Sequence, residues 1–125
     1  MYLRPLMAAL ALSAAAPALA AAPGDVSAHE FYTNALALKK KGVMAMVSGK
    51  LPAAKAQFKD AMTRVRDDNL AAKARGTPKY CPPEKGSITV DALLGGLAAI
   101  PEPRRRAISL TEAWREILVS RYPCR

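Results

Sequence analysis

Few side chains of this 125-residue chain are of types that do chemistry, and they are far apart in sequence. His29 is the only histidine and follows a helix-capping serine, so we expect it on the surface. Asp67 and Asp68 are adjacent in a predicted helix, where neighbouring side chains diverge by about 100° and cannot act as a pair. Nucleophile, phosphate-binding and dinucleotide-binding motifs are missing from the sequence. We therefore expect a protein that is not an enzyme and needs no cofactor or metal.

The first 20 residues have the composition of a secretory signal peptide. Arg4 is the only charge before a run rich in Leu, Ala and Met, and Ala18-Leu19-Ala20 provides the small-x-small pattern that signal peptidase accepts. Pro5 and Pro17 bracket the apolar run and leave it too short to span a hydrocarbon core of ~30 Å, which argues against an uncleaved anchor. We predict cleavage after Ala20, a single domain over residues 21–125, and a periplasmic location.

The two cysteines, Cys81 and Cys124, are the main chemical signal of the mature chain. They lack the CxxC spacing of a redox motif, and one distant histidine makes them a poor zinc set. An even cysteine count in an exported chain predicts a disulfide, for which two cysteines allow one intramolecular pairing. In the chain-entropy model, a disulfide that closes the loop from Cys81 to Cys124 stabilises the folded state by about 4 kcal/mol. We expect the ring of one or both of the flanking Tyr80 and Tyr122 to cover the sulfurs.

The chain is basic, with 19 Lys and Arg against 10 Asp and Glu, a formal charge of +9. Cleavage removes only Arg4 and leaves 18 basic and 10 acidic residues, or +8, which favours acidic partners or anionic envelope surfaces. Nucleic acid is not expected as a partner of an exported protein. Of the two basic runs, Lys39-Lys40-Lys41 opposes the dipole at a predicted helix end. Arg104-Arg105-Arg106 has two interpretations, a weak candidate contact with a partner's carboxylate or phosphate, or a solubilising turn that opposes the dipole of the preceding helix.

Hydrophobic periodicity predicts four main helices and no sheet. The expected helices cover residues 28–41, 52–75, about 89–100, and 110 to about 122. Capping boxes open the first and last of these, at Ser27-x-x-Glu30 and Ser109-x-x-Glu112. The predicted fold class is all-α, a small disulfide-bonded bundle of about four helices after a cleaved signal peptide.

The connecting segments are predicted from glycine, proline and short apolar runs. Residues 43–47 (VMAMV) are expected as a helical turn or two tucked under the core, and residues 79–87 as a loop. Gly95-Gly96 in the third helix favours the close approach of another helix over a binding cleft. Pro101-Glu102-Pro103 is expected to break the chain and to place the arginine run in a turn.

Residues 80–124 resemble the C-terminal part of the Rap/Tai family of type VI secretion immunity proteins. The resemblance is carried by Tyr80-Cys81-Pro82-Pro83, by a helix that ends at Ile100-Pro101, and by Tyr122-Pro123-Cys124. It implies an exported, helical, disulfide-bonded domain that binds a peptidoglycan amidase effector and occludes its active site. Family members commonly have more cysteines and a Gly-Tyr-containing stretch in the N-terminal half, which this chain lacks. Only the two cysteines therefore correspond, in a structural role.

Two functions from different classes follow. The leading hypothesis is a periplasmic immunity protein that binds and inhibits a peptidoglycan-degrading, amidase-type type VI secretion effector. The alternative is a non-catalytic periplasmic helical stress or envelope protein that binds anionic surfaces. The expected partner is a secreted peptidoglycan hydrolase, a homodimer is compatible with the sequence, and contact with a membrane is expected only during export.

Overall fold

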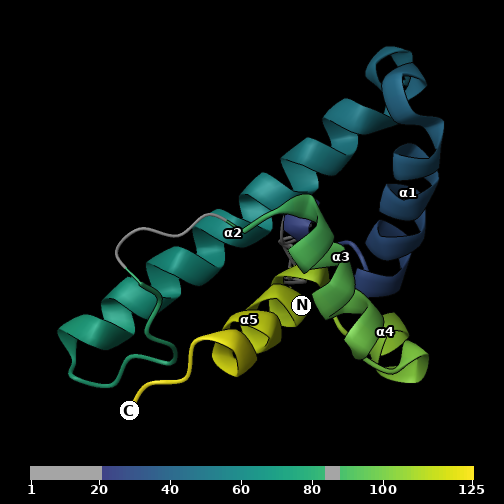
Figure 1. Cartoon of the computed structure of the whole chain (residues 1–125). Coiled ribbons are helices and arrows are strands. Elements are labelled where there is room, and N and C mark those ends of the chain that lie inside the picture. The colour runs from purple at the N-terminus through teal and green to yellow at the C-terminus, as the bar shows by residue number, and fades with distance from the viewer. Residues whose placement is uncertain (1–20, 84–87) are drawn as a thin grey trace, which may run out of the picture.

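The computed structural model describes residues 21–83 and 88–125, and the predicted signal peptide lies outside this range. The chain is an all-α bundle closed by one disulfide, as predicted (Figure 1). Its elements are η1 (Pro23–Asp25), α1 (Ala28–Lys41), η2 (Gly42–Val47), α2 (Lys50–Ala74), α3 (Val90–Ala99), α4 (Glu102–Ala107) and α5 (Leu110–Arg121). The described residues contain no strand, only an isolated antiparallel bridge between Ser27 and Ser109.

The serine half of both predicted capping boxes forms, and the two serines lie next to each other. The Ser27 hydroxyl accepts a hydrogen bond from the Glu30 amide (3.0 Å), and the Ser109 hydroxyl accepts one from the Glu112 amide (3.1 Å). Each serine thereby satisfies one of the amides that a helix start leaves without a partner. Because the antiparallel bridge joins these same two serines, α1 and α5 begin side by side.

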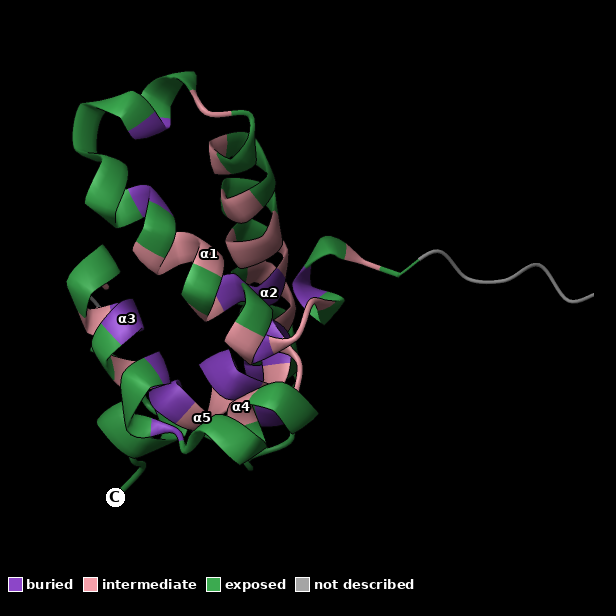
Figure 2. Cartoon of the chain, turned by 90° about the vertical axis from the view of Figure 1, so that its right-hand side faces the viewer, coloured by how far each residue is buried: buried purple, intermediate pink, exposed green. Residues whose placement is uncertain are grey.

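The core lies where α1, α2, α3 and α5 meet, as the buried parts of these helices show (Figure 2). Phe58 packs edge-to-face against Trp114, with ring centroids 5.0 Å apart, and Phe31 stacks on Phe58 at 6.4 Å. The buried cluster comprises Ala28, Phe31, Ala61, Val65, Tyr80, Leu93, Leu97, Ile100, Leu110, Ala113, Trp114, Ile117 and Leu118. Within the described part of the chain, the members of this cluster run from Ala28 to Leu118.

The first described residues are held by polar contacts with α2 and α5. The Gly24 amide donates to Asp60 (2.8 Å), and the Gly24 carbonyl accepts from the Thr111 hydroxyl (2.9 Å). Arg64 forms an ion pair with Asp25 at 2.7 Å, and its hydrogen bond holds the pKa of the Asp25 carboxyl below its usual range. A side chain at Gly24 would lie 2.7 Å from Asp60 and Thr111, so this close approach requires glycine.

Gly96 allows the predicted close approach of another helix, which is α5. A Cβ atom built at Gly96 would lie 3.0 Å from three side-chain atoms of Ile117. At the neighbouring Gly95, no atom lies within 4 Å of the added Cβ. The two adjacent glycines thus have different roles, since only Gly96 is required by packing.

Two predictions about the connections are wrong. The prolines end α3, but Pro103 is the second residue of α4, where a missing amide costs nothing, and the arginine run therefore lies on a short helix and not in a turn. The η2 segment is exposed apart from Ala45 and is not tucked under the core. Gly42 has a φ of 56°, and η2 joins α1 to α2 beyond the end of the core (Figure 1).

Candidate functional site

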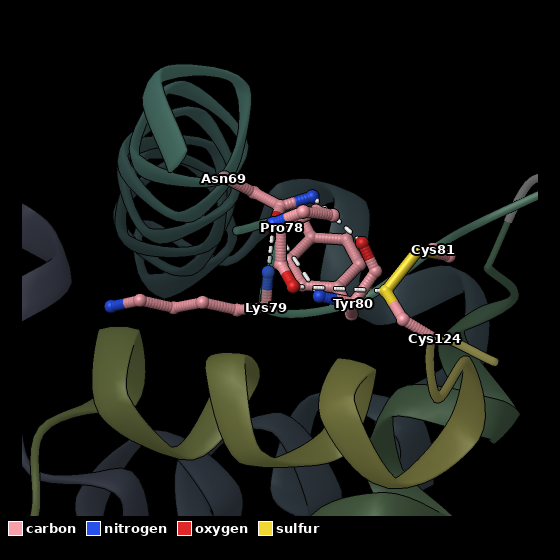
Figure 3. Close-up of a disulfide and its surroundings, with 6 residues drawn as sticks. All are labelled: Asn69, Pro78, Lys79, Tyr80, Cys81 and Cys124. Carbon is pink, nitrogen blue, oxygen red and sulfur yellow. Dashed lines mark hydrogen bonds between the residues drawn. A yellow bond between two sulfur atoms is a disulfide. The ribbon is translucent and has the colours of Figure 1, made fainter. Parts of the chain in front are cut away.

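The predicted disulfide links Cys81 to Cys124, with Cα atoms 5.0 Å apart (Figure 3). The Cys81 amide donates to the Tyr122 carbonyl at 2.8 Å, and Cys124 Sγ lies 3.7 Å from the Pro78 carbonyl oxygen. Both cysteine residues remain exposed, so the flanking tyrosines do not bury the bridge. Tyr80 belongs instead to the core, and Tyr122 packs against that core.

Asn69 organises the loop that carries Cys81, a role that sequence reasoning missed. Its side chain is buried and accepts hydrogen bonds from the amides of Lys79 (2.8 Å) and Tyr80 (3.3 Å). It also donates to the Tyr80 carbonyl at 3.0 Å (Figure 3). The sequence does contain a sign of this role, because Asn69 lies four residues after Val65 and three before Ala72, on the apolar face of α2.

The arginine run is engaged within the molecule. Arg105 lies over the Tyr32 ring, 4.5 Å from its centroid, and donates to the carbonyls of Leu97 (3.2 Å) and Ile100 (2.7 Å) at the end of α3. This contact satisfies carbonyls that a helix end leaves free and places a cation at the negative end of the helix dipole. Arg105 therefore favours the interpretation in which the run opposes the dipole of the preceding helix over the one in which it contacts a partner.

The other two arginines and His29 belong to the same surface. Arg104 forms an ion pair with Glu116, whose hydrogen bond raises the pKa of the guanidinium. Arg106 pairs with Glu102 at 3.1 Å, and His29 Nε2 lies 3.4 Å from that carboxylate. These contacts join α1, α4 and α5, and they leave no member of the arginine run without an internal partner.

The acidic residues do not converge. Asp68 pairs with Arg115 of α5 at 2.9 Å, whereas Asp67 faces Arg66 at 3.7 Å. Within residues 21–83 and 88–125, no group of three His, Cys, Asp or Glu side chains is placed to hold a metal ion. No helix in this part of the chain is long and apolar enough to cross a membrane.

An apolar groove between α1, α2 and α3 is the best candidate binding site. Its volume is about 290 Å³, and apart from Lys39 and Lys55 every residue that lines it is apolar. The lining comprises Phe31, Ala35, Leu38, Ala45, Leu51, Ala54, Phe58, Val90, Leu93 and Leu94. Lys39 also forms an ion pair with Asp91 at 2.6 Å, which ties α1 to the start of α3. The groove can bind an apolar group and attract negative charge at its lysines, but its side chains offer no acid–base pair.

The η2 tip, defined here as Val43, Met44, Met46 and Val47, is a second unusual surface. All four side chains are exposed, while Ala45 between them faces the groove. Lysines flank the tip on both sides, at the end of α1 and at the start of α2. The groove and the η2 tip are adjacent but distinct, since none of the four tip residues lines the groove.

A second groove lies between α3 and α5, with a volume of about 520 Å³. Gly95, Gly96 and Ala99 form one wall, and Glu116, Ile117 and Ser120 form the other. The glycine pair therefore borders a hollow as well as the close helix contact that the sequence favoured.

No protein-family model, curated protein or solved structure matches the chain.

Proposed function

We propose that this protein is a non-catalytic, periplasmic immunity protein that binds and inhibits a secreted peptidoglycan hydrolase of the amidase type. The observation that carries the proposal is the apolar groove, which is open, lined by three helices, and bordered by two lysines. The resemblance of residues 80–124 to the Rap/Tai family and the basic charge of the chain support it. The groove is the proposed contact site.

The chemistry of the groove specifies what it can receive. Its aromatic and aliphatic lining suits a bulky apolar side chain, and binding energy in protein interfaces is concentrated in a few such buried anchors. Lys39 and Lys55 would attract carboxylates beside that anchor and steer an acidic surface towards the groove. The complementary partner surface is therefore an apolar side chain surrounded by acidic residues.

Inhibition would follow from occlusion. A folded domain bound beside the catalytic cleft keeps the peptidoglycan strand from reaching the reacting atoms, without any bond being made or broken. The walls of the groove are already ordered in the free protein, because α1, α2 and α3 also form the core. A preformed site loses little conformational entropy on binding, which favours a tight, stoichiometric complex.

Affinity capture with two matched variants tests the proposal. Segment 21–125 is the bait in periplasmic extract, and the proteins that survive a high-salt wash are identified by mass spectrometry and assayed for peptidoglycan cleavage. Val90→Glu puts a charge at the exposed edge of the groove, whereas Val119→Glu makes the same change on α5, outside it. We expect wild type and Val119→Glu to retain and inhibit one hydrolase, and Val90→Glu to bind it about tenfold or more weakly.

Three results would contradict the proposal. A salt-labile mixture without a cell-wall hydrolase would remove the proposed partner. A hydrolase that binds but keeps its full activity would remove inhibition. Equal losses of binding in the two variants would show that the groove is not the contact site.

A further inference from the structure

We infer that the η2 tip is a membrane-surface anchor that inserts into the outer part of an anionic bilayer. Its apolar side chains would lie among the acyl chains, and the neighbouring lysines would contact lipid phosphates. This role is separate from the proposed inhibition, and it differs from the expectation that the protein meets a membrane only during export. The inference rests on exposure, shape and charge.

The exposure of the tip is concentrated in one short segment. The exposed fractions are 81% for Val43, 63% for Met44, 78% for Met46 and 78% for Val47. The other large exposed apolar residues, Met62, Leu70, Val90 and Val119, are dispersed over three helices. A contiguous exposed apolar patch of this kind marks an interaction surface.

The shape of the tip favours a bilayer over a protein partner. A 3₁₀ helix has three residues per turn, so consecutive side chains point about 120° apart. Val43 and Met46 therefore lie on one side of this two-turn helix, Met44 and Val47 lie on a second side, and Ala45 lies on the third. A protein would have to contact two sides of this helix to bury all four side chains, whereas a bilayer surrounds any group that enters it.

The charge around the tip is complementary to anionic lipid. Residues 31–59 contain six lysines, at positions 39, 40, 41, 50, 55 and 59, and no acidic residue, and of these lysines Lys39 is paired with Asp91 of α3. Lys40 and Lys41 end α1 and Lys50 begins α2, so cations lie on both sides of the apolar turn. Apolar residues flanked by lysines are typical of segments that lie in the interface of an anionic membrane.

The fold places the tip where it can reach a flat surface. The tip is at one end of α2, and the disulfide and the C-terminus are at the other (Figure 1). With 25 residues, α2 is about 37 Å long at 1.5 Å per residue. A protein anchored through η2 would therefore present its disulfide-bonded end to the solvent.

Vesicle binding tests the anchor, with disulfide-bonded segment 21–125 and a matched pair of variants. We expect co-sedimentation with phosphatidylethanolamine vesicles containing roughly one-third phosphatidylglycerol to exceed that with pure phosphatidylcholine by about tenfold. Met44→Ser combined with Met46→Ser should weaken binding by about tenfold, because the apolar area that enters the bilayer is lost. Leu70→Ser, on the far half of α2 and 57% exposed, should bind like wild type.

A fluorescence measurement reports the insertion itself. The indole introduced by Met44→Trp should shift to shorter wavelength on anionic vesicles and be quenched by lipids brominated on their acyl chains. The native Trp114 is only 3% exposed, so the same quencher should leave wild-type fluorescence unchanged. Quenching in both proteins would mean that the bilayer unfolds the domain, and this would overturn the inference.

Other results also overturn the inference. If wild type does not bind anionic vesicles, or if the double serine variant binds as well as Leu70→Ser, the tip does not insert. If the double serine variant loses a protein partner while vesicle binding is absent, the tip belongs to a protein interface. The groove proposal is tested separately, because Val90→Glu and hydrolase capture can succeed or fail whatever the vesicle result.

Discussion

At the scale of single residues, Asn69 connects the longest helix to the loop that carries the disulfide. One amide side chain provides an acceptor for two backbone amides and a donor for one carbonyl. Residues 79 and 80 have no helix or sheet partner, so Asn69 replaces the backbone pairing that regular structure would supply. Burial also raises the pKa of the Tyr80 hydroxyl, consistent with its place in the core.

Replacing Asn69 should therefore destabilise the protein strongly. We expect Asn69→Ala to lower the free energy of unfolding by about 2–4 kcal/mol, since buried polar groups lose their partners. Asp67→Ala removes a polar side chain from the exposed side of the same helix and should change stability by about 0.5 kcal/mol or less. Urea denaturation monitored by circular dichroism measures the free energy of unfolding of both variants. Similar midpoints for the two variants would show that the network around Asn69 contributes little.

At the scale of elements, the packing of α3 on α5 depends on one glycine of an adjacent pair. Gly96 is in contact with α5, whereas Gly95 faces open space. Ile117 is buried and β-branched, so it has little freedom to move away from an added methyl group. The two positions have the same helical propensity, and their comparison isolates packing.

Alanine at the two glycines should have opposite effects. Gly95→Ala should stabilise the protein by up to about 1 kcal/mol, because alanine is the better helix former and the site has room. Gly96→Ala should destabilise it by about 1–3 kcal/mol through overpacking against Ile117. Thermal unfolding of both variants provides the measurement. Equal stabilisation by both would show that α5 moves aside without loss.

The sequence was sufficient to predict the helices that local signals define. The first predicted helix, 28–41, coincides with α1. The second, predicted at 52–75, agrees with α2 except that α2 starts two residues earlier, at Lys50, and ends one residue earlier, at Ala74. Capping serines, glycines and prolines are local, so they can be read without knowing the packing. The same reasoning missed α4, because a proline in the first turn of a helix and a proline that breaks one look alike in sequence.

The candidate sites could be predicted only in part, because they depend on how closely the helices pack and on what they leave uncovered. An apolar run such as residues 43–47 has the same sequence pattern whether it is buried in a core or projects from it. Ala54 and Phe58 are spaced to share one face of α2, but the sequence does not show that α1, α2 and α3 leave part of that face uncovered. The arginine run was visible as charge, and only the folded chain supplies its internal partners.

At the scale of the whole molecule, the disulfide closes α3, α4 and α5 into one loop and fixes its end beside the exit of α2. Reduction, or Cys81→Ala combined with Cys124→Ala, should lower the free energy of unfolding by about 2–4 kcal/mol. The double alanine variant should be insensitive to reductant, which makes it the control for reduction. Intact-mass analysis should find both wild-type thiols blocked until reduction, and two free thiols in the oxidised sample would refute the bridge.

The position of α5 also has a consequence for how the chain is made. Residues 110–125 contribute Trp114 and Ile117 to the core, Thr111 to the contact with Gly24, and Cys124 to the disulfide. A nascent chain that lacks α5 has neither the centre of its core nor the contact that holds Gly24. The core therefore cannot be completed before α5 has been synthesised, although α1, α2 and α3 are already available by then.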